Sequence, residues 1–129
     1  VTTLPFQLSI NGMFDYVRGR LVQGGDLPRI PPLRVGLGLE VITNDLSIGM
    51  NMLRYLSQNR VADFESTTSG YTIVNIDINF SFFTDSVEWL FFMRGTNLFD
   101  DEIINHSSFI KDIAPEAGRA LNAGVRISF

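Results

Sequence analysis

The chain has 129 residues, of which 45% are hydrophobic and eleven are Phe, with a formal net charge of −4 at pH 7. This length fits one domain or a piece of a larger one, and an acidic chain with only ten basic residues is a poor candidate for nucleic-acid binding. The absence of cysteine excludes disulfides and thiolate chemistry in this chain. No apolar run approaches the roughly 18 residues of a spanning helix, so a membrane-spanning reading must be a barrel.

The first strand is expected over residues 6–16, where apolar and polar side chains alternate except at Met13. The pattern runs on, so we expect this strand to continue through Arg18 and Arg20. Two glycines and three prolines in residues 23–32 then predict a long loop. The sequence starts without Met and without an apolar signal segment, from which we expect upstream sequence to be missing.

A second strand is expected over residues 33–42, with Gly36 and Gly38 on its polar side. A Gly-x-Gly pair inside a strand lacks the third glycine and the strand-to-helix context of a nucleotide-binding loop. The pair therefore indicates close packing or bending of the sheet.

A tight turn at residues 44–45 predicts a third strand that starts at Leu46 and runs towards Val61. Only Arg54 interrupts its apolar side, and on a lipid-facing surface Arg is best tolerated near the interface, here the outer end of the strand. Residues 62–70 are polar and form a second expected loop.

The fourth strand, residues 74–82, is the most regular, and a tight turn at residues 84–86 leads to a fifth that begins at residue 87. The longest loop, residues 100–118, precedes the terminal strand, residues 119–129. At about ten residues this last strand is long enough to cross a bilayer at a tilt, and it ends on the aromatic Phe129.

The connections are thus long, short, long, short and long, an arrangement typical of outer-membrane barrels. The side chains opposite the apolar rows are too polar for a dry core and fit a wet lumen. The fold class expected is all-β, an antiparallel transmembrane β-barrel segment of about six strands; a soluble β-sandwich is the alternative. The residues predicted to face the lumen are Arg34, Glu40, Asp77, Glu88, Arg94 and Arg126.

Two interpretations of these lumen-facing charges remain open: contacts with a plug domain, or an ion-pair network that stiffens the wall. Glu88 and Arg126 are expected to pair across the ladder near the inner end. Six strands are too few for a closed barrel, since bacterial single-chain barrels begin at about eight. We therefore expect the segment alone to leave its first and last strands as unpaired edges.

Three stretches, residues 92–100 (FMRGTNLFD), 115–119 (PEAGR) and 124–129 (GVRISF), resemble the C-terminal end of TonB-dependent outer-membrane receptors. That family typically shows a strand ending in Asn-Leu-Phe-Asp or Asn-Leu-Leu-Asp, a variable outer loop, and Pro-Gly-Arg before a strand ending in Phe. Here Ala117 stands where a proline is usual. The resemblance covers about the last 45 residues, with a looser match over residues 28–62.

The resemblance implies that residues 1–129 are the C-terminal part of a barrel of about 22 strands that encloses a plug. Such a receptor imports a scarce nutrient, for example a metal chelate (iron–siderophore, haem or zinc), across the bacterial outer membrane with energy delivered through TonB. Its partners would be outer-membrane lipid, lipopolysaccharide, the TonB complex and the barrel assembly machinery. That machinery reads the last strand, whose apolar row is Val125, Ile127 and Phe129. No cofactor and no enzymatic activity are implied.

The long final loop carries the side chains that could contact a ligand or a metal. These candidates are Asp100, Asp101, Glu102, His106 and Asp112. Oxygen and imidazole ligands suit zinc or an iron chelate, but a single His is far from a full ligand set. A Ser-His-Asp hydrolase would also depend on His106, the one histidine, with no strand or elbow to fix it. The alternatives kept open are a passive porin or adhesin barrel and an outer-membrane hydrolase.

Overall fold

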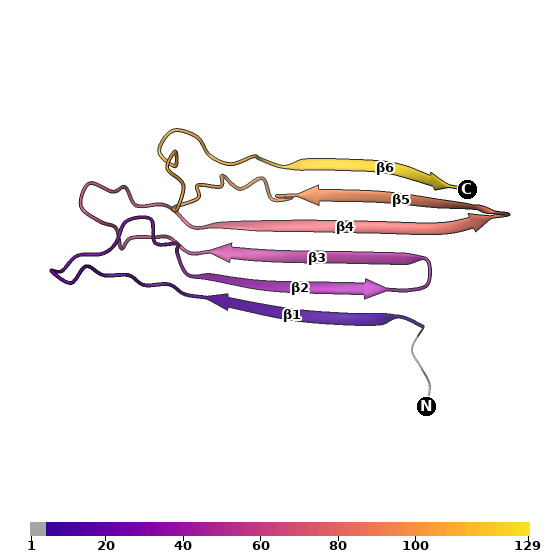
Figure 1. The fold of residues 1–129 in the computed structure, drawn as a ribbon, viewed down its shortest axis with the longest axis horizontal. Helices are drawn as coiled ribbons and strands as arrows, with labels where there is room; N and C mark the ends of the chain where they lie inside the picture. Colours follow the sequence, from indigo (N-terminus) through magenta and orange to yellow (C-terminus); the bar gives the residue numbers. More distant parts are fainter. Residues whose placement is uncertain (1–4) are drawn as a thin grey trace, which may run out of the picture.

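The period-two pattern of the sequence produces six strands, paired antiparallel in the order β1-β2-β3-β4-β5-β6 (Figure 1). The computed structural model describes residues 5–129, so the expectation about sequence before Val1 lies outside the described residues. The strands are β1 Gln7–Asp15, β2 Arg34–Ile42, β3 Leu46–Tyr55, β4 Tyr71–Thr84, β5 Val87–Thr96 and β6 Ala120–Ser128. Across residues 5–129 no helix is long and apolar enough to cross a membrane.

All short connections lie at one end of the sheet, the turn end, and all long loops lie at the other, the loop end (Figure 1). The β2–β3 turn is closed by Thr43, whose N–H donates to Leu46 O at 2.8 Å and whose Oγ1 accepts from Leu46 N at 2.9 Å. The β4–β5 turn places Asp85 at a φ of 53°, a left-handed conformation that Asp tolerates better than most residues. The predicted sorting of the connections is therefore confirmed.

Two strands end earlier than the sequence pattern predicts. β1 stops at Asp15, and Arg20 makes only an isolated bridge with Asp26. β3 stops at Tyr55 because the following chain folds over: Gln58 pairs with Thr68 instead of continuing the ladder. The expected continuations through Arg20 and towards Val61 are wrong, since contacts between loops compete with the strand pairing there.

The register brings the apolar rows of all six strands onto one side of the sheet, here called the apolar face. Ile10 lies opposite Leu39, Leu39 opposite Met50 and Phe91 opposite Val125. Among the strand residues of this face, the one charged side chain is Arg54. It lies near the loop end, as predicted, and its Nη1 donates to Thr72 Oγ1 at 2.9 Å.

The turn end of the apolar face carries a cluster of aromatic rings. Phe82 stacks on Trp89 and on Phe91, with ring centroids 6.2 Å and 6.0 Å apart, and Phe80 lies 6.0 Å from Phe82. Phe129 follows β6 at the same end and is fully exposed. A belt of aromatics at one rim of an apolar surface is typical of a membrane interface.

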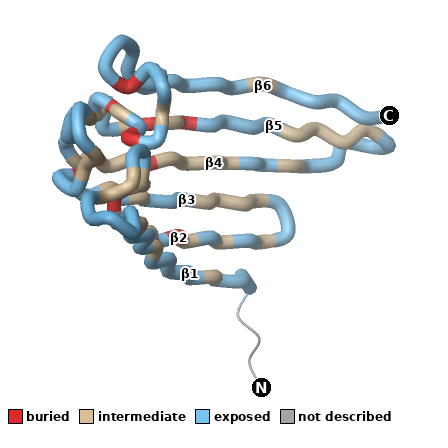
Figure 2. The backbone as a smooth tube through the Cα atoms, turned by 60° about the vertical axis from the view of Figure 1, so that its left-hand side comes forward, coloured by how far each residue is buried: buried red, intermediate tan, exposed pale blue. Residues whose placement is uncertain are grey.

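Neither face of the sheet is covered by another layer within the described residues (Figure 2). Ile10 and Leu121 on the apolar face keep 66% and 68% of their surface exposed. Most buried side chains lie at the loop end, among them Tyr71, Ile103 and His106. A sandwich would bury its apolar rows against a second sheet, whereas this sheet leaves a large apolar surface open, which indicates an interaction surface.

Candidate functional site: a polar wall beneath a loop cap

The face opposite the apolar face is the polar wall, and all six charged residues predicted to face a lumen lie on it. The register places Arg34 opposite Asp15, Asp77 opposite Arg94, and Glu40 and Glu88 opposite the serines Ser9 and Ser128. Arg126 lies opposite Leu90 on the same face. The alternation of side chains along each strand explains why the six residues share a face, because residues directly opposite in an antiparallel sheet point to the same side.

Two ion pairs cross the wall between directly opposite residues. Arg34 Nε donates to Asp15 Oδ2 at 2.8 Å, and Arg94 Nε donates to Asp77 Oδ1 at 2.5 Å. The expected pairing of Glu88 with Arg126 is wrong: the two are diagonal neighbours, and no ion pair joins them in the described part of the chain. Glu88 lies opposite Ser128 and Arg126 opposite Leu90, a register two residues away from the one that would pair them directly.

The glycine pair of β2 lies under the side chains of its neighbours on the wall. A Cβ at Gly38 would lie 2.5 Å from the Asn11 side chain, and one at Gly36 would lie 2.8 Å from Leu53 Cδ2. The interpretation of this pair as a site of close packing is confirmed.

Three long loops meet at the loop end and form the loop cap, whose centre is a buried polar cluster of Glu65, Thr68, His106 and Lys111. His106 is 1% exposed and Lys111 9%. Lys111 Nζ donates to Ser66 O at 2.7 Å and lies 3.4 Å from Glu65 Oε1. The cluster joins the β3–β4 loop to the β5–β6 loop, and Glu65 Oε1 also accepts from Arg29 N of the β1–β2 loop at 2.8 Å.

The contacts of His106 fix its tautomer. Nδ1 lies 2.9 Å from Thr68 Oγ1 and 3.4 Å from Lys111 Nζ. An ammonium can only donate, so Nδ1 accepts and the proton stays on Nε2, which lies 3.4 Å from Glu65 Oε1. Burial lowers the pKa of His106, and the Lys111 ammonium lowers it further, so the ring is neutral.

Glu65 is held ionised in this cluster. Burial alone would raise its pKa, but the N–H groups of Ala62 and Arg29 and the ammonium of Lys111 outweigh burial and keep the pKa below its usual value. A buried carboxylate beside a buried ammonium compensates both charges. Glu65 and Lys111 therefore form a buried ion pair that joins the β3–β4 loop to the β5–β6 loop.

The five ligand candidates of the final loop are dispersed by the structure. Asp100 Oδ1 accepts from Arg119 N and Asp101 Oδ2 from Thr72 N, both at 2.8 Å, so these side chains shape the base of the loop. Asp112 accepts from Ser66 Oγ, and Glu102 is exposed. Within residues 5–129 no three His, Cys, Asp or Glu side chains are grouped to hold a metal ion. Metal contact by His106 stays a prediction.

Thr68, His106 and Glu65 lie in an order like that of a catalytic triad, but the Thr68 hydroxyl is buried. Thr68 is 7% exposed and its hydroxyl contacts the same ring nitrogen as Lys111. A nucleophile needs a substrate carbonyl within reach, and this hydroxyl faces the interior of the cap. The cluster serves to hold the loops together.

A pocket of about 260 Å³ opens on the polar wall directly below the cap. Tyr55 and Tyr71 stack with ring centroids 4.5 Å apart, and Arg34 and Glu116 supply charge beside them. Stacked aromatics with flanking polar groups are usual in small-molecule sites. The pocket depends on residues from four strands and the β5–β6 loop, which is why sequence periodicity alone did not identify it.

No family model matches the chain. Among solved structures the chain is similar to a protein described as "Copper transporter OprC", with a TM-score of 0.71 and 23% sequence identity over 93% of this chain. The chain spans 20% of the length of that protein. The similarity concerns the fold, an antiparallel all-β segment of a transporter barrel, and agrees with the predicted fold class.

Proposed function

We propose that this chain is the C-terminal part of a bacterial outer-membrane receptor that imports a scarce small nutrient, such as a metal chelate. The observation that carries the proposal is the division of one open sheet into an apolar face and a polar wall, with short turns at one end and long loops at the other. A hydrocarbon environment suits the first face and a water-filled lumen the second. The similarity in fold to a protein described as a copper transporter also supports metal transport.

In this proposal the loop end faces outwards and the turn end faces the periplasm. The lumen would be lined by Arg34, Glu40, Asp77, Glu88, Arg94 and Arg126. The aromatic pocket below the cap, with Tyr55, Tyr71 and Arg34, lies where an incoming ligand would first meet the barrel. Energy would come through TonB and a plug outside this chain, as the family resemblance implies.

The experiment compares energised uptake with passive flow through the full-length protein. Cells that lack the endogenous route and express this protein are supplied with radiolabelled copper, ferric siderophore, haem or zinc, with and without a protonophore. We expect uptake of one of these ligands that stops when the protonophore collapses the proton gradient.

The alternatives give different results in the same system. A passive porin passes small solutes into proteoliposomes without any energy source, and an adhesin accumulates none of the ligands. An outer-membrane hydrolase turns over ester or peptide substrates and loses that activity in His106→Ala. Uptake that is insensitive to the protonophore would overturn the receptor proposal.

A further inference from the structure

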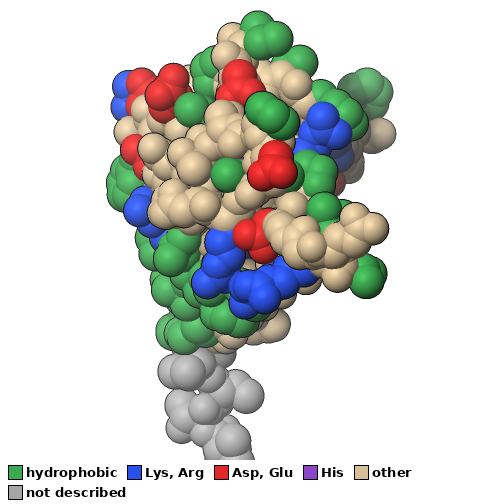
Figure 3. All heavy atoms as spheres, turned by 90° about the vertical axis from the view of Figure 1, so that its left-hand side faces the viewer, with side chains coloured by type: hydrophobic (Ala, Val, Ile, Leu, Met, Phe, Trp, Pro, Cys, Tyr) green, Lys and Arg blue, Asp and Glu red, His purple; other side chains and the backbone are tan. Residues whose placement is uncertain are grey.

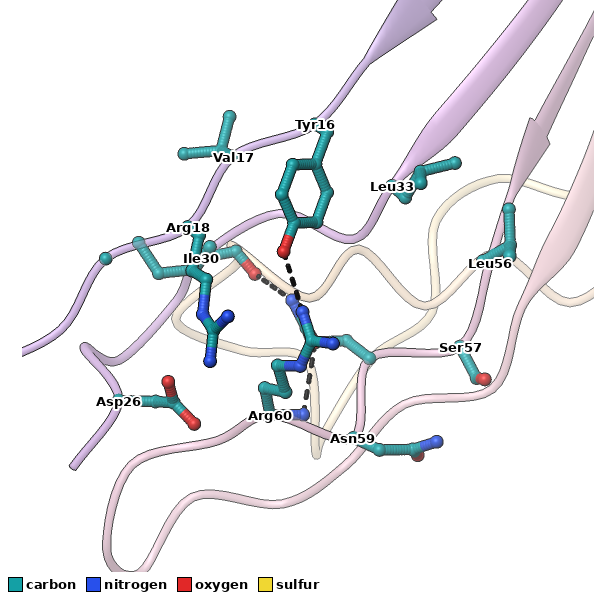
Figure 4. Close-up of a pocket in the computed structure, with 12 residues that line it drawn as sticks. Tyr16, Val17, Arg18, Asp26, Ile30, Leu33, Leu56, Ser57, Asn59 and Arg60 are labelled. Carbon is teal, nitrogen blue, oxygen red and sulfur yellow. Dashed lines mark hydrogen bonds between the residues drawn. The ribbon is translucent and has the colours of Figure 1, made fainter.

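A second pocket, of about 310 Å³, lies at the loop end on the side of the apolar face (Figure 4). It is formed by the β1–β2 and β3–β4 loops, and Leu33 and Leu56 lie in its wall. Leu56 N donates to Leu33 O at 2.9 Å, which extends the β2–β3 ladder by one pair. Both leucines therefore continue the alternation towards the apolar face, and the pocket opens above that face.

Two guanidinium groups, from Arg18 and Arg60, line this pocket together with its apolar residues. Arg60 Nη1 donates to Tyr16 Oη at 2.7 Å, and Figure 4 shows the Tyr16 hydroxyl pointing at this guanidinium. Neither Arg18 nor Arg60 has a carboxylate partner among residues 5–129. The pocket's one carboxylate, Asp26, lies 3.8 Å from Arg20 Nε.

A buried amide, that of Gln58, holds the backbone of Arg60 at the pocket. Gln58 is 8% exposed, its Nε2 donates to Ile30 O at 3.0 Å, and its Oε1 accepts from Arg60 N at 3.1 Å. These bonds join the two loops at the base of the pocket. Gln58 thus holds the backbone of Arg60 and Tyr16 holds its guanidinium before any ligand arrives, which lowers the entropic cost of binding.

The charge of this rim is opposite to that of a phosphorylated lipid headgroup. Arg54 lies on the apolar face of β3, two residues before Leu56, so a further guanidinium lies on the face below the pocket that Arg18 and Arg60 line. Figure 3 shows basic side chains gathered beside hydrophobic ones at the loop end. Guanidinium groups bind phosphate oxygens in a bidentate manner, and the apolar rows of β1, β2 and β3 below would contact acyl chains.

We propose that this pocket binds the phosphate group of a lipid in the outer leaflet of the membrane. The inference rests on the proposed function only in taking the apolar face as the lipid-facing side. Arg18 and Arg60 hold the phosphate, Tyr16 orients Arg60, and Leu33 and Leu56 contact the apolar part of the lipid next to its phosphate.

The experiment uses the full-length protein reconstituted in phosphatidylcholine nanodiscs that contain either a bis-phosphorylated lipid A or the same lipid with its phosphates removed. Lipid retained after detergent extraction is counted by native mass spectrometry. We expect retention of the phosphorylated lipid to fall at least about tenfold in the double variant Arg18→Gln, Arg60→Gln. The control Arg119→Gln changes an exposed arginine that immediately precedes β6 and lies outside the pocket, so it should retain the lipid as the parent does.

Each other outcome has a defined meaning. Arg60→Lys keeps the charge but loses the bidentate geometry, so it should show an intermediate loss and serves if the double variant fails to insert. Equal retention by parent and double variant, or of both lipids, would overturn the proposal, as would displacement of the lipid by millimolar inorganic phosphate. Failure of the parent protein to enter nanodiscs at all would instead contradict the membrane-spanning function proposed above, and with it the lipid-facing position of the pocket.

Discussion

The lipid-facing role proposed for the apolar face can be tested by placing one charge at the same depth on either side of the sheet. Ile78 is the middle residue of the apolar row of β4, which runs from Val74 to Phe82. At about 3.3 Å per residue the row is about 26 Å long, or about 20 Å deep at a tilt of about 40°. This depth fits an apolar band about 25 Å tall, so the proposed function places Ile78 near the midplane of the bilayer.

We expect Ile78→Lys to lower the free energy of unfolding from the bilayer by about 2–4 kcal/mol, the cost of Lys at midplane depth. This corresponds to about a 30-fold to 900-fold change in the folding equilibrium. The residues directly opposite are Ile48 and Met93, so no carboxylate lies across the ladder to pair with the new ammonium.

The matched control is Asn79→Lys, one residue along the same strand but on the polar wall, opposite Ser47 and Phe92. A wetted ammonium there should change stability by less than about 0.5 kcal/mol. Both variants are unfolded by denaturant in lipid vesicles as part of the full-length protein. Equal losses, or a larger loss for Asn79→Lys, would refute the face assignment, because a slip of one residue exchanges the two faces.

Three further results are expected. Glu65→Gln leaves the buried Lys111 ammonium without its carboxylate and should ease opening of the loop cap by about 1–3 kcal/mol, seen as faster hydrogen exchange in the loops; the exposed Glu102→Gln should leave exchange unchanged. The pKa of His106 is lower in the folded cap than in the unfolded chain, so the unfolded cap binds more protons at acidic pH. The contribution of His106 to cap stability is therefore fully present above pH 6.5 and decreases as the pH falls below this value. Proteolysis of the loops at pH 7.5 and 5.5 measures this change. Deletion of Phe129 should reduce the membrane-inserted fraction, by heat-modifiability on gels, while the inserted protein keeps its ligand affinity; normal insertion would argue against an assembly role for the last strand.

The sequence was sufficient to predict the strands, their faces and the sorting of the connections, because each depends on alternation and on local turn chemistry. Arg34 and Asp77 could be assigned to one face from their own strands alone. The strand ends at Asp15 and Tyr55 could not be predicted in this way. They depend on contacts between loops that are far apart in the chain.

The loop cap was not predicted for the same reason. Glu65 and Lys111 are separated by 46 residues and have no shared spacing or motif. His106 was singled out as a possible metal ligand because it is the one histidine, yet its neighbours Thr68 and Lys111 place it in the interior of the cap. Composition identified an unusual residue, and only the fold showed its surroundings.

The opposite directions of the two edge strands set a parity rule for any closed form of this sheet. β1 runs towards the loop end and β6 runs towards the turn end (Figure 1). In a closed ring in which every neighbouring pair is antiparallel, the strand direction must alternate at every step between the loop end and the turn end. Strands that complete such a ring must therefore be even in number, and the strand that pairs with β1 must run towards the turn end while the strand that pairs with β6 runs towards the loop end.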